Sequence, residues 1–183
     1  MARRIAYEGE PVLTLQEVAY QCKIEPEDME PELIEQIIIP GVTSQCESKT
    51  GAAIRRALYE EHWQQGHGSG QPLDVGQVIE VESVIALAAD GSDSQQPVVV
   101  ELRCSAREGF LHFPGGRPAA ALRIRYRAGV DLDVHPGARS WMLMAAATAY
   151  KQRETLVTGQ TLVHLPSSWL DHLLADITVP ARF

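Results

Sequence analysis

The segment spanning residues 134–156 constrains the fold most, because it is the longest apolar stretch with helical spacing. It opens at His135-Pro136, and proline is tolerated at the first helical position, where an N–H would be unbonded anyway. Its apolar residues spread so far around the predicted helix that little polar face remains before Lys151. A helix of this kind must be covered on several sides. We therefore expect a small helical bundle around it, completed by a neighbouring copy of the chain. The residues expected to make this subunit packing are Trp141, Met142, Ala145, Ala149 and Tyr150.

Two further helices are predicted before this segment. Thr14 and Glu17 have the spacing of a capping box, which predicts a helix from Leu15 to about Lys23. An acidic turn follows, and Pro31 can open a second helix that ends at Gly51, a suitable C-cap. Pro40 interrupts this pattern, so the sequence predicts either one long helix kinked at Pro40 or two abutting helices.

From residue 73 onward the apolar period changes and β-branched residues dominate. Asp90-Gly91 predicts a turn, residues 98–103 a return strand, and residues 109–113 a short strand. The segment 121–127 alternates apolar residues with arginines, which is typical of a half-buried strand. The segment 53–63 is ambiguous between a helical turn and an extended strand. Together these patterns predict a small antiparallel sheet inserted between helical parts.

The resulting fold class is α+β, mainly α: a small helical bundle around one long apolar helix, with an inserted antiparallel β-sheet and extended termini. We expect one domain over residues 1–183. Its helical core would comprise about 12–63 and 133–175, its β insertion about 73–129, and its C-terminal arm about 164–183. Residues 1–11 are expected to form an arm.

Composition limits the possible functions. The net charge of −8 disfavours sequence-specific nucleic-acid binding, which normally uses a basic face. It still permits an acidic wall past which DNA slides. Three widely spaced cysteines indicate free thiols in a reducing compartment. No stretch approaches the ~20 apolar residues that span a bilayer, and no apolar signal core follows the basic start, so neither membrane association nor secretion is predicted.

No catalytic, metal or cofactor site is predicted. His62 and His67 lie near each other in sequence but have no acidic or cysteine partner at ligand spacing. The glycine-rich segment 113–118 lacks the spacing of a phosphate-binding loop. The arginines of segment 121–127 could bind an anion. We favour a strand face that resists edge-to-edge aggregation or meets an acidic neighbour.

The order of these parts resembles the head-to-tail connector (adaptor) family of long-tailed phages, whose members form a ring beneath the portal. The capped helix LTLQEVAYQCKI is followed by a helix ending in CESKTGAAI, a β insertion closing on IRYRAG, and the helix HPGARSWMLMAAATAYKQRE. A tail, LPSSWLDHLLADITVPARF, completes the chain. The most specific shared positions are Thr14, Glu17, Glu47, Thr50, Gly51, Tyr126, Gly129, Tyr150, Arg153 and Glu154.

The resemblance implies a non-enzymatic structural protein, made in the host cytoplasm and located in the virion neck. About a dozen copies would form a ring that docks on the portal protein, extends the DNA channel and receives the next neck or tail-completion protein. Double-stranded DNA would pass without sequence-specific contacts. The C-terminal arm would contact the portal through Trp169, Leu173, Leu174, Ile177, Val179 and Phe183. The candidates for an acidic channel lining are Glu25, Glu27, Asp28, Glu30 and Glu32.

Two other hypotheses remain open at the level of sequence. The β insertion could form the pocket of a small enzyme or ligand-binding domain, with His112, Arg123 and Arg125 as the residues to mutate. Alternatively, the chain could be a tail-completion or neck protein of a different type.

Overall fold

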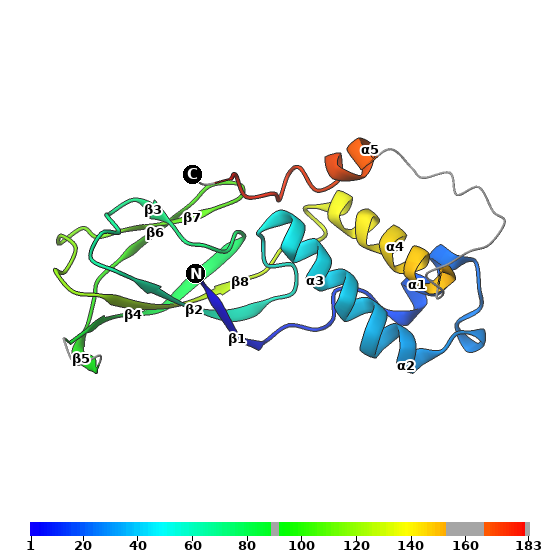
Figure 1. Ribbon diagram of the computed structural model, residues 1–183, viewed down its shortest axis with the longest axis horizontal. Coiled ribbons are helices and arrows are strands. Elements are labelled where there is room, and N and C mark those ends of the chain that lie inside the picture. Colours follow the sequence, from blue (N-terminus) through cyan, green and yellow to red (C-terminus); the bar gives the residue numbers. More distant parts are fainter. Residues whose placement is uncertain (89–91, 153–166, 182–183) are drawn as a thin grey trace. The chain divides into compact units, whose positions relative to one another are not determined.

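The computed structural model describes residues 1–88, 92–152 and 167–181, and the chain divides into two compact units (Figure 1). The strand unit comprises Met1–Glu10, Gly51–Val130 and Ile177–Phe183. The helical unit comprises Pro11–Thr50 and Asp131–Asp176. Each unit is therefore assembled from segments that are distant in the sequence.

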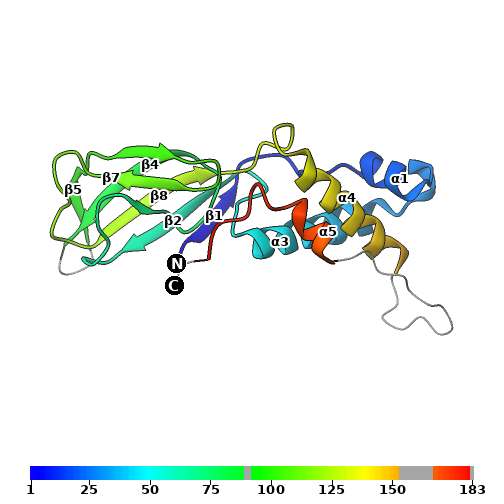
Figure 2. The ribbon, with the colours of Figure 1, turned by 90° about the horizontal axis from the view of Figure 1, so that it is seen from above.

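The strand unit contains two antiparallel sheets, whose strands appear from a second direction in Figure 2. The five-stranded sheet has the order β1 (Arg3–Tyr7), β2 (Ala57–Trp63), β8 (Leu122–Ala128), β4 (Val78–Leu87), β5 (Asp93–Pro97). The three-stranded sheet has the order β3 (Gln71–Pro72), β7 (Gly109–His112), β6 (Glu101–Cys104). Residues of both sheets share one apolar core, which includes Trp63, Leu111 and Tyr126.

Strand β8 is the centre of the larger sheet, because it pairs with β2 on one side and β4 on the other. Its buried residues alternate with partly buried ones, as the sequence pattern predicted. Leu122, Ile124 and Tyr126 are inaccessible to solvent, and burying an aliphatic side chain of this size contributes about 1.5–3 kcal/mol. The Tyr126 ring stacks on Tyr59 of β2, with ring centroids 5.8 Å apart.

The helical unit begins at the predicted capping box. Helix α1 (Leu15–Cys22) has Thr14 as its N-cap: the Glu17 N–H donates to Thr14 Oγ1 at 3.3 Å, and the Thr14 N–H donates to Glu17 Oε2 at 2.8 Å. Arg139 of helix α4 (Pro136–Lys151) forms a 2.8 Å ion pair with Glu17 Oε1. The same glutamate therefore caps α1 and links it to α4.

The helical run from Pro31 to Thr50 consists of α2 (Pro31–Leu33), a π-helical turn η2 (Ile34–Ile38) and α3 (Ile39–Thr50), preceded by the 3-10 turn η1 (Pro26–Asp28). The Ile39 N–H donates to the Ile34 carbonyl, one residue farther than in an α-helix. The wider turn comes directly before Pro40, which lacks an N–H for the α-helical ladder. Gly51 follows α3 with φ +68°, as predicted for a C-cap.

The predicted fold class is wrong in its proportions, because the chain is not mainly helical and no long apolar helix organises it. Strands form two sheets with a core of their own. Helix α4 has 16 residues, and α1, η2 and α3 pack against it. These neighbours cover part of the apolar surface of α4, for which the sequence pattern also predicted contact with a neighbouring copy.

Several strand predictions also need correction. Residues 3–7, expected in an extended arm, form the edge strand β1, and the ambiguous segment 53–63 contains β2. The segment 98–103 is not the return strand of β4. Strand β5 pairs with β4, while β6 pairs with β7 in the smaller sheet. The predicted Asp90-Gly91 turn lies outside the described residues.

The C-terminal part of the chain contributes to both units. Helix α5 (Ser167–His172) lies in the helical unit, whereas Ile177 is 1% exposed and belongs to the strand unit. Val179 lies against Gly51 and Gly76 so closely that a Cβ at Gly76 would be 2.5 Å from Val179 Cγ2. Among the described residues, no helix is both long and apolar enough to cross a membrane.

Candidate functional site

The five residues predicted to make subunit packing differ in how accessible they are. Trp141, Met142 and Tyr150 are 5%, 0% and 8% exposed, so they fill the core of their own unit. Ala145 is half-buried and Ala149 is exposed. Contact of these residues with a neighbouring subunit stays a prediction, and Ala149 is the member of the set whose surface is free for it.

The five acidic residues proposed as channel lining are all exposed. Glu25, Glu27 and Asp28 lie at or within η1, while Glu30 and Glu32 lie at the start of the following helical run. Residues 24–48 contain seven carboxylates and no lysine, arginine or histidine. This stretch therefore forms the most strongly acidic surface segment of the chain.

The net charge is confined to one unit. By sequence, the helical unit has 13 acidic and 5 basic residues, and the strand unit has 11 of each. The helical unit thus carries the whole net charge of −8, while the strand unit is neutral. This distribution gives the two units different electrostatic character, since a surface with net negative charge repels anions.

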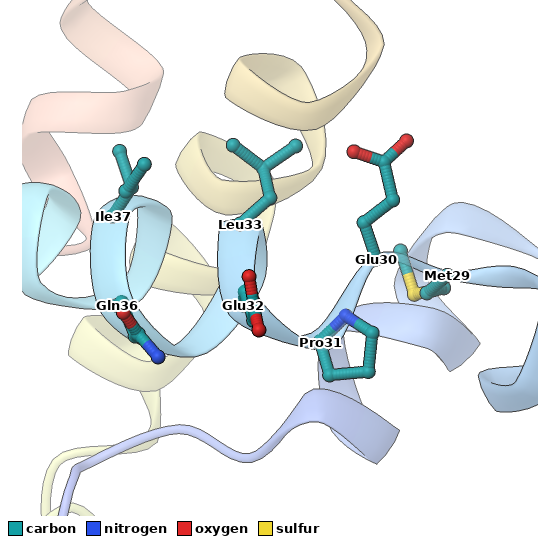
Figure 3. A pocket seen from close by; sticks show the side chains of 7 residues that line it. All are labelled: Met29, Glu30, Pro31, Glu32, Leu33, Gln36 and Ile37. Carbon is teal, nitrogen blue, oxygen red and sulfur yellow. The ribbon is translucent and has the colours of Figure 1, made fainter.

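An open hollow lies on the acidic segment, at the π-helical turn (Figure 3). Figure 3 shows Glu30, Leu33 and Ile37 projecting on the same side of the helical run. Ile37 is 63% exposed, an unusual position for a large aliphatic side chain within an acidic stretch. The residues that line the hollow are Met29, Glu30, Pro31, Glu32, Leu33, Gln36 and Ile37.

The arginines of β8 are paired with carboxylates of the same unit. Arg125 Nε is 3.0 Å from Glu60 Oε2, and Arg123 pairs with both Glu60 and Asp93. Burial alone would raise the pKa of Glu60, but the hydrogen bond and charge of Arg125 bring it below its ordinary value. The predicted acidic neighbour is therefore present. Protection of a sheet edge is not the reason for these arginines, because β8 is a central strand.

Arg127 has the densest set of acidic partners on this face. Its guanidinium pairs with Glu8 at 2.7 Å, Glu82 at 2.9 Å and Glu80 at 3.3 Å. The hydrogen bond to Glu8 is the main reason that its pKa is raised. With Arg123 and Arg125 also engaged, these cations are already compensated within the chain, which weakens the hypothesis of an anion-binding or enzymatic pocket around them.

His112, the third residue of that hypothesis, lies on β7 of the other sheet. Its ring is next to Gly70, where a Cβ would lie 3.2 Å from His112 Cε1. His62 is 3.6 Å from Glu60, and His67 stacks on Trp63. Within the part of the chain that the structure describes, no three His, Cys, Asp or Glu side chains are grouped as metal ligands. The contacts found for His62, His67 and His112 are therefore structural ones within the strand unit.

Glu61 is a buried carboxylate that sequence reasoning missed. It is 2% exposed and accepts three hydrogen bonds: from Trp63 Nε1 at 2.6 Å, the Asp74 N–H at 3.0 Å and the Tyr126 hydroxyl at 3.1 Å. Burial raises its pKa, and the three donors partly oppose this shift. The sequence signal that could have identified Glu61 is its position in β2. Buried residues alternate along this strand, and Glu61 falls on the buried side with Tyr59 and Trp63.

The N-terminal edge of the larger sheet is basic and partly apolar. All five residues of β1 are exposed, including Ile5 at 41% and Tyr7 at 39%. The guanidinium groups of Arg4 and Arg55 lie 4.1 and 4.4 Å from the centroid of the Tyr7 ring. We call this surface, formed by Arg3, Arg4, Ile5, Tyr7 and Arg55, the basic edge.

The predicted portal-contacting residues are mostly packed within the chain. Leu174 and Ile177 are buried, and Leu173 and Val179 are half-buried. Trp169 is 48% exposed, and Phe183 lies outside the described residues. Portal contact stays a prediction for this set, and Trp169 offers the largest exposed side chain in it.

Comparison with solved structures identifies the fold. A chain in the virion of a native gene transfer agent particle superimposes with a TM-score of 0.74 and 15% identity. Chains in the neck of the empty particle, computed with C6 symmetry, and of the native particle, computed with C12 symmetry, give TM-scores of 0.73 and 0.63 at 14% and 15% identity. Each match covers 100% of this chain and 97% of the other. No protein-family model and no curated protein matches the sequence. The predicted resemblance to neck proteins is thus confirmed at the level of the fold.

Proposed function

We propose that this protein is a structural component of a virion neck, where copies of it form a ring that joins a DNA-filled head to a tail. The observation that carries the proposal is the match, over its full length, to chains of gene transfer agent particles that include neck structures of C6 and C12 symmetry. Both units of the chain take part in the match, so it is not limited to a common helical or sheet motif.

The distribution of charge supports a role beside passing DNA. A ring that DNA must traverse needs a surface that does not retain phosphates, and an acidic surface meets this requirement. Glu25, Glu27 and Asp28 are exposed at the acidic turn η1 and are the residues we assign to the channel wall. The arginines of β8 do not counter this role, because carboxylates of the same sheet already pair with them.

We further propose that the ring contains about a dozen copies and has distinct partners on its two sides. The portal protein would lie on the head side, contacted by the C-terminal segment through Trp169. The next neck or tail-completion protein would lie on the tail side.

The test is electron microscopy of the purified chain, alone and mixed with the portal protein encoded in the same genome. Rings of this protein stacked on the portal ring are the expected result. The variant Trp169→Glu should weaken the stacking. It should leave the thermal unfolding midpoint unchanged, since Trp169 is exposed. A chain that stays monomeric and does not associate with the portal would contradict the proposal.

A further inference from the structure

We infer that the hollow at the π-helical turn is an interface between copies, and that it receives the basic edge of a second copy of this chain. The inference rests on the proposed ring and specifies which surfaces close it. It also divides the acidic segment, because Glu30 and Glu32 then face protein while Glu25, Glu27 and Asp28 remain for the channel wall.

The first argument is the chemistry of the hollow. The residues that line it include the apolar Met29, Leu33 and Ile37 together with the carboxylates Glu30 and Glu32. A channel wall for DNA gains nothing from an aliphatic side chain that is 63% exposed. An apolar centre bordered by charge is instead the usual composition of a protein interface.

The second argument is charge complementarity. Residues 24–48 contain seven carboxylates and no lysine, arginine or histidine, so this surface is acidic. The basic edge has the opposite character, since Arg3 and Arg4 directly precede the exposed Ile5 and Arg55 lies on Tyr7. Arg3 also pairs with Glu60 of its own sheet at 3.5 Å, but its side chain stays mostly exposed. Placing Ile5 against Ile37 and Leu33 would bring the arginines to the level of Glu30 and Glu32.

The third argument is symmetry. A ring requires a heterologous contact, in which two different surfaces of each copy meet. The hollow belongs to the helical unit and the basic edge to the strand unit, so each copy carries one of each. Gly41 lies one helical turn beyond Ile37, and a Cβ there would meet nothing within 4 Å apart from its adjacent residues and the backbone of its own helical turns, which leaves room for a neighbour to approach.

Site-directed cross-linking tests this pairing. The background is Cys104→Ser, which removes the exposed thiol. Cys22 and Cys46 are buried, and burial raises the pKa of Cys46 to about 12, so neither competes for a maleimide. In this background Ile5→Cys and Ile37→Cys are combined, the protein is assembled with its portal, and a short bis-maleimide is added.

The expected result is a ladder of covalent dimers, trimers and larger species on a denaturing gel, because each copy links to the next. Ile37→Cys combined with Ile79→Cys, whose isoleucine is 46% exposed on β4, is the matched control and should give no ladder. Cross-linking by Ile37→Cys alone would reveal a symmetric contact and overturn the inference.

A charge exchange provides the second readout. Glu30→Arg with Glu32→Arg should lower the ladder yield about tenfold or more, since like charges across an interface cost several kcal/mol. Adding Arg3→Glu and Arg4→Glu should restore it. Rings visible by microscopy without a ladder in the Ile5/Ile37 variant would refute the inferred pairing alone, whereas failure to form rings at all would refute the proposed function as well.

Discussion

The carboxyl group of Glu61 makes the stability of the strand unit sensitive to pH. In the unfolded chain this group titrates near the ordinary glutamate value of about 4.3, whereas burial raises its pKa in the folded protein. The folded state therefore holds the proton to higher pH than the unfolded state does. It follows that the contribution of Glu61 to stability falls as pH rises from about 4.3 through its folded pKa.

We predict that Glu61→Gln removes this pH dependence. Urea unfolding across the acidic-to-neutral range should show the wild-type free energy of unfolding decreasing relative to that of the variant as pH rises. Glu35→Gln is the control, because Glu35 is exposed and should leave the wild-type profile unchanged. A wild-type-to-variant difference that is constant with pH, or that changes in the opposite direction, would show that the buried carboxylate does not titrate as argued.

Gly129 shows why a glycine follows β8. A Cβ at this position would lie 2.7 Å from the Arg56 Cα, and backbone cannot move aside as the end of a side chain can. We predict that Gly129→Ala lowers the free energy of unfolding by about 1–3 kcal/mol, the usual cost of overpacking. In Gly41→Ala, by contrast, the added methyl meets open space within a helix, and the unfolding free energy of the free chain should rise by about 0.4–1 kcal/mol. Equal effects of the two substitutions in chemical denaturation would contradict this account.

Among the elements, α4 tests how the helical unit is held together. Trp141 and Tyr150 are both nearly buried, and α1, η2 and α3 surround their helix. Trp141→Ala and Tyr150→Ala should each cost about 3–5 kcal/mol, the range for removal of a large aromatic side chain from a core. Ala149→Ser, at an exposed position of the same helix, should change stability by less than about 0.5 kcal/mol. A loss below about 1 kcal/mol for both aromatic variants in denaturant titrations would mean that the helix is not packed as described.

The same elements show how far sequence reasoning reached. Strand β8 and helix α1 were predictable, because an uninterrupted alternation and a capping box are local signals. Strand β1 was missed because all five of its side chains are exposed, which leaves no alternation to detect. Strand β2 was ambiguous because Glu61 stands where an apolar residue would have completed its pattern. The weight given to α4 was excessive because its apolar surface is covered by elements whose packing no local pattern records.

The candidate surfaces also include features that the sequence could predict and features that it could not. That the carboxylates from Glu25 to Glu32 are exposed could be predicted, because carboxylates are costly to bury. The hollow beside them could not, since two of the residues that line it, Gln36 and Ile37, lie in the π-helical turn Ile34–Ile38, which no sequence pattern predicted. The arginine pairs of β8 required the register of the sheet, which places Glu60 opposite Arg125.

At the scale of the whole molecule, the confinement of net charge to the helical unit leads to a prediction about DNA. We predict that the purified chain does not retain double-stranded DNA at about 0.15 M salt, because phosphate binding requires a basic surface that outweighs nearby acids. Fluorescence anisotropy with a labelled duplex should show no saturable change. A replacement of Glu25, Glu27 and Asp28 by lysine should introduce binding that weakens steeply with salt. Micromolar, salt-dependent binding by the wild-type chain would contradict an acidic channel wall.

The central claim is that this protein joins a head to a tail. It is tested most directly in the organism or virus whose genome encodes the protein and its particle. The measurement is the fraction of tailed particles in electron micrographs after deletion of the coding sequence, with and without complementation by the intact chain. The account predicts heads that lack tails after deletion and tailed particles after complementation. Tailed particles at the wild-type frequency in the deletion would contradict it.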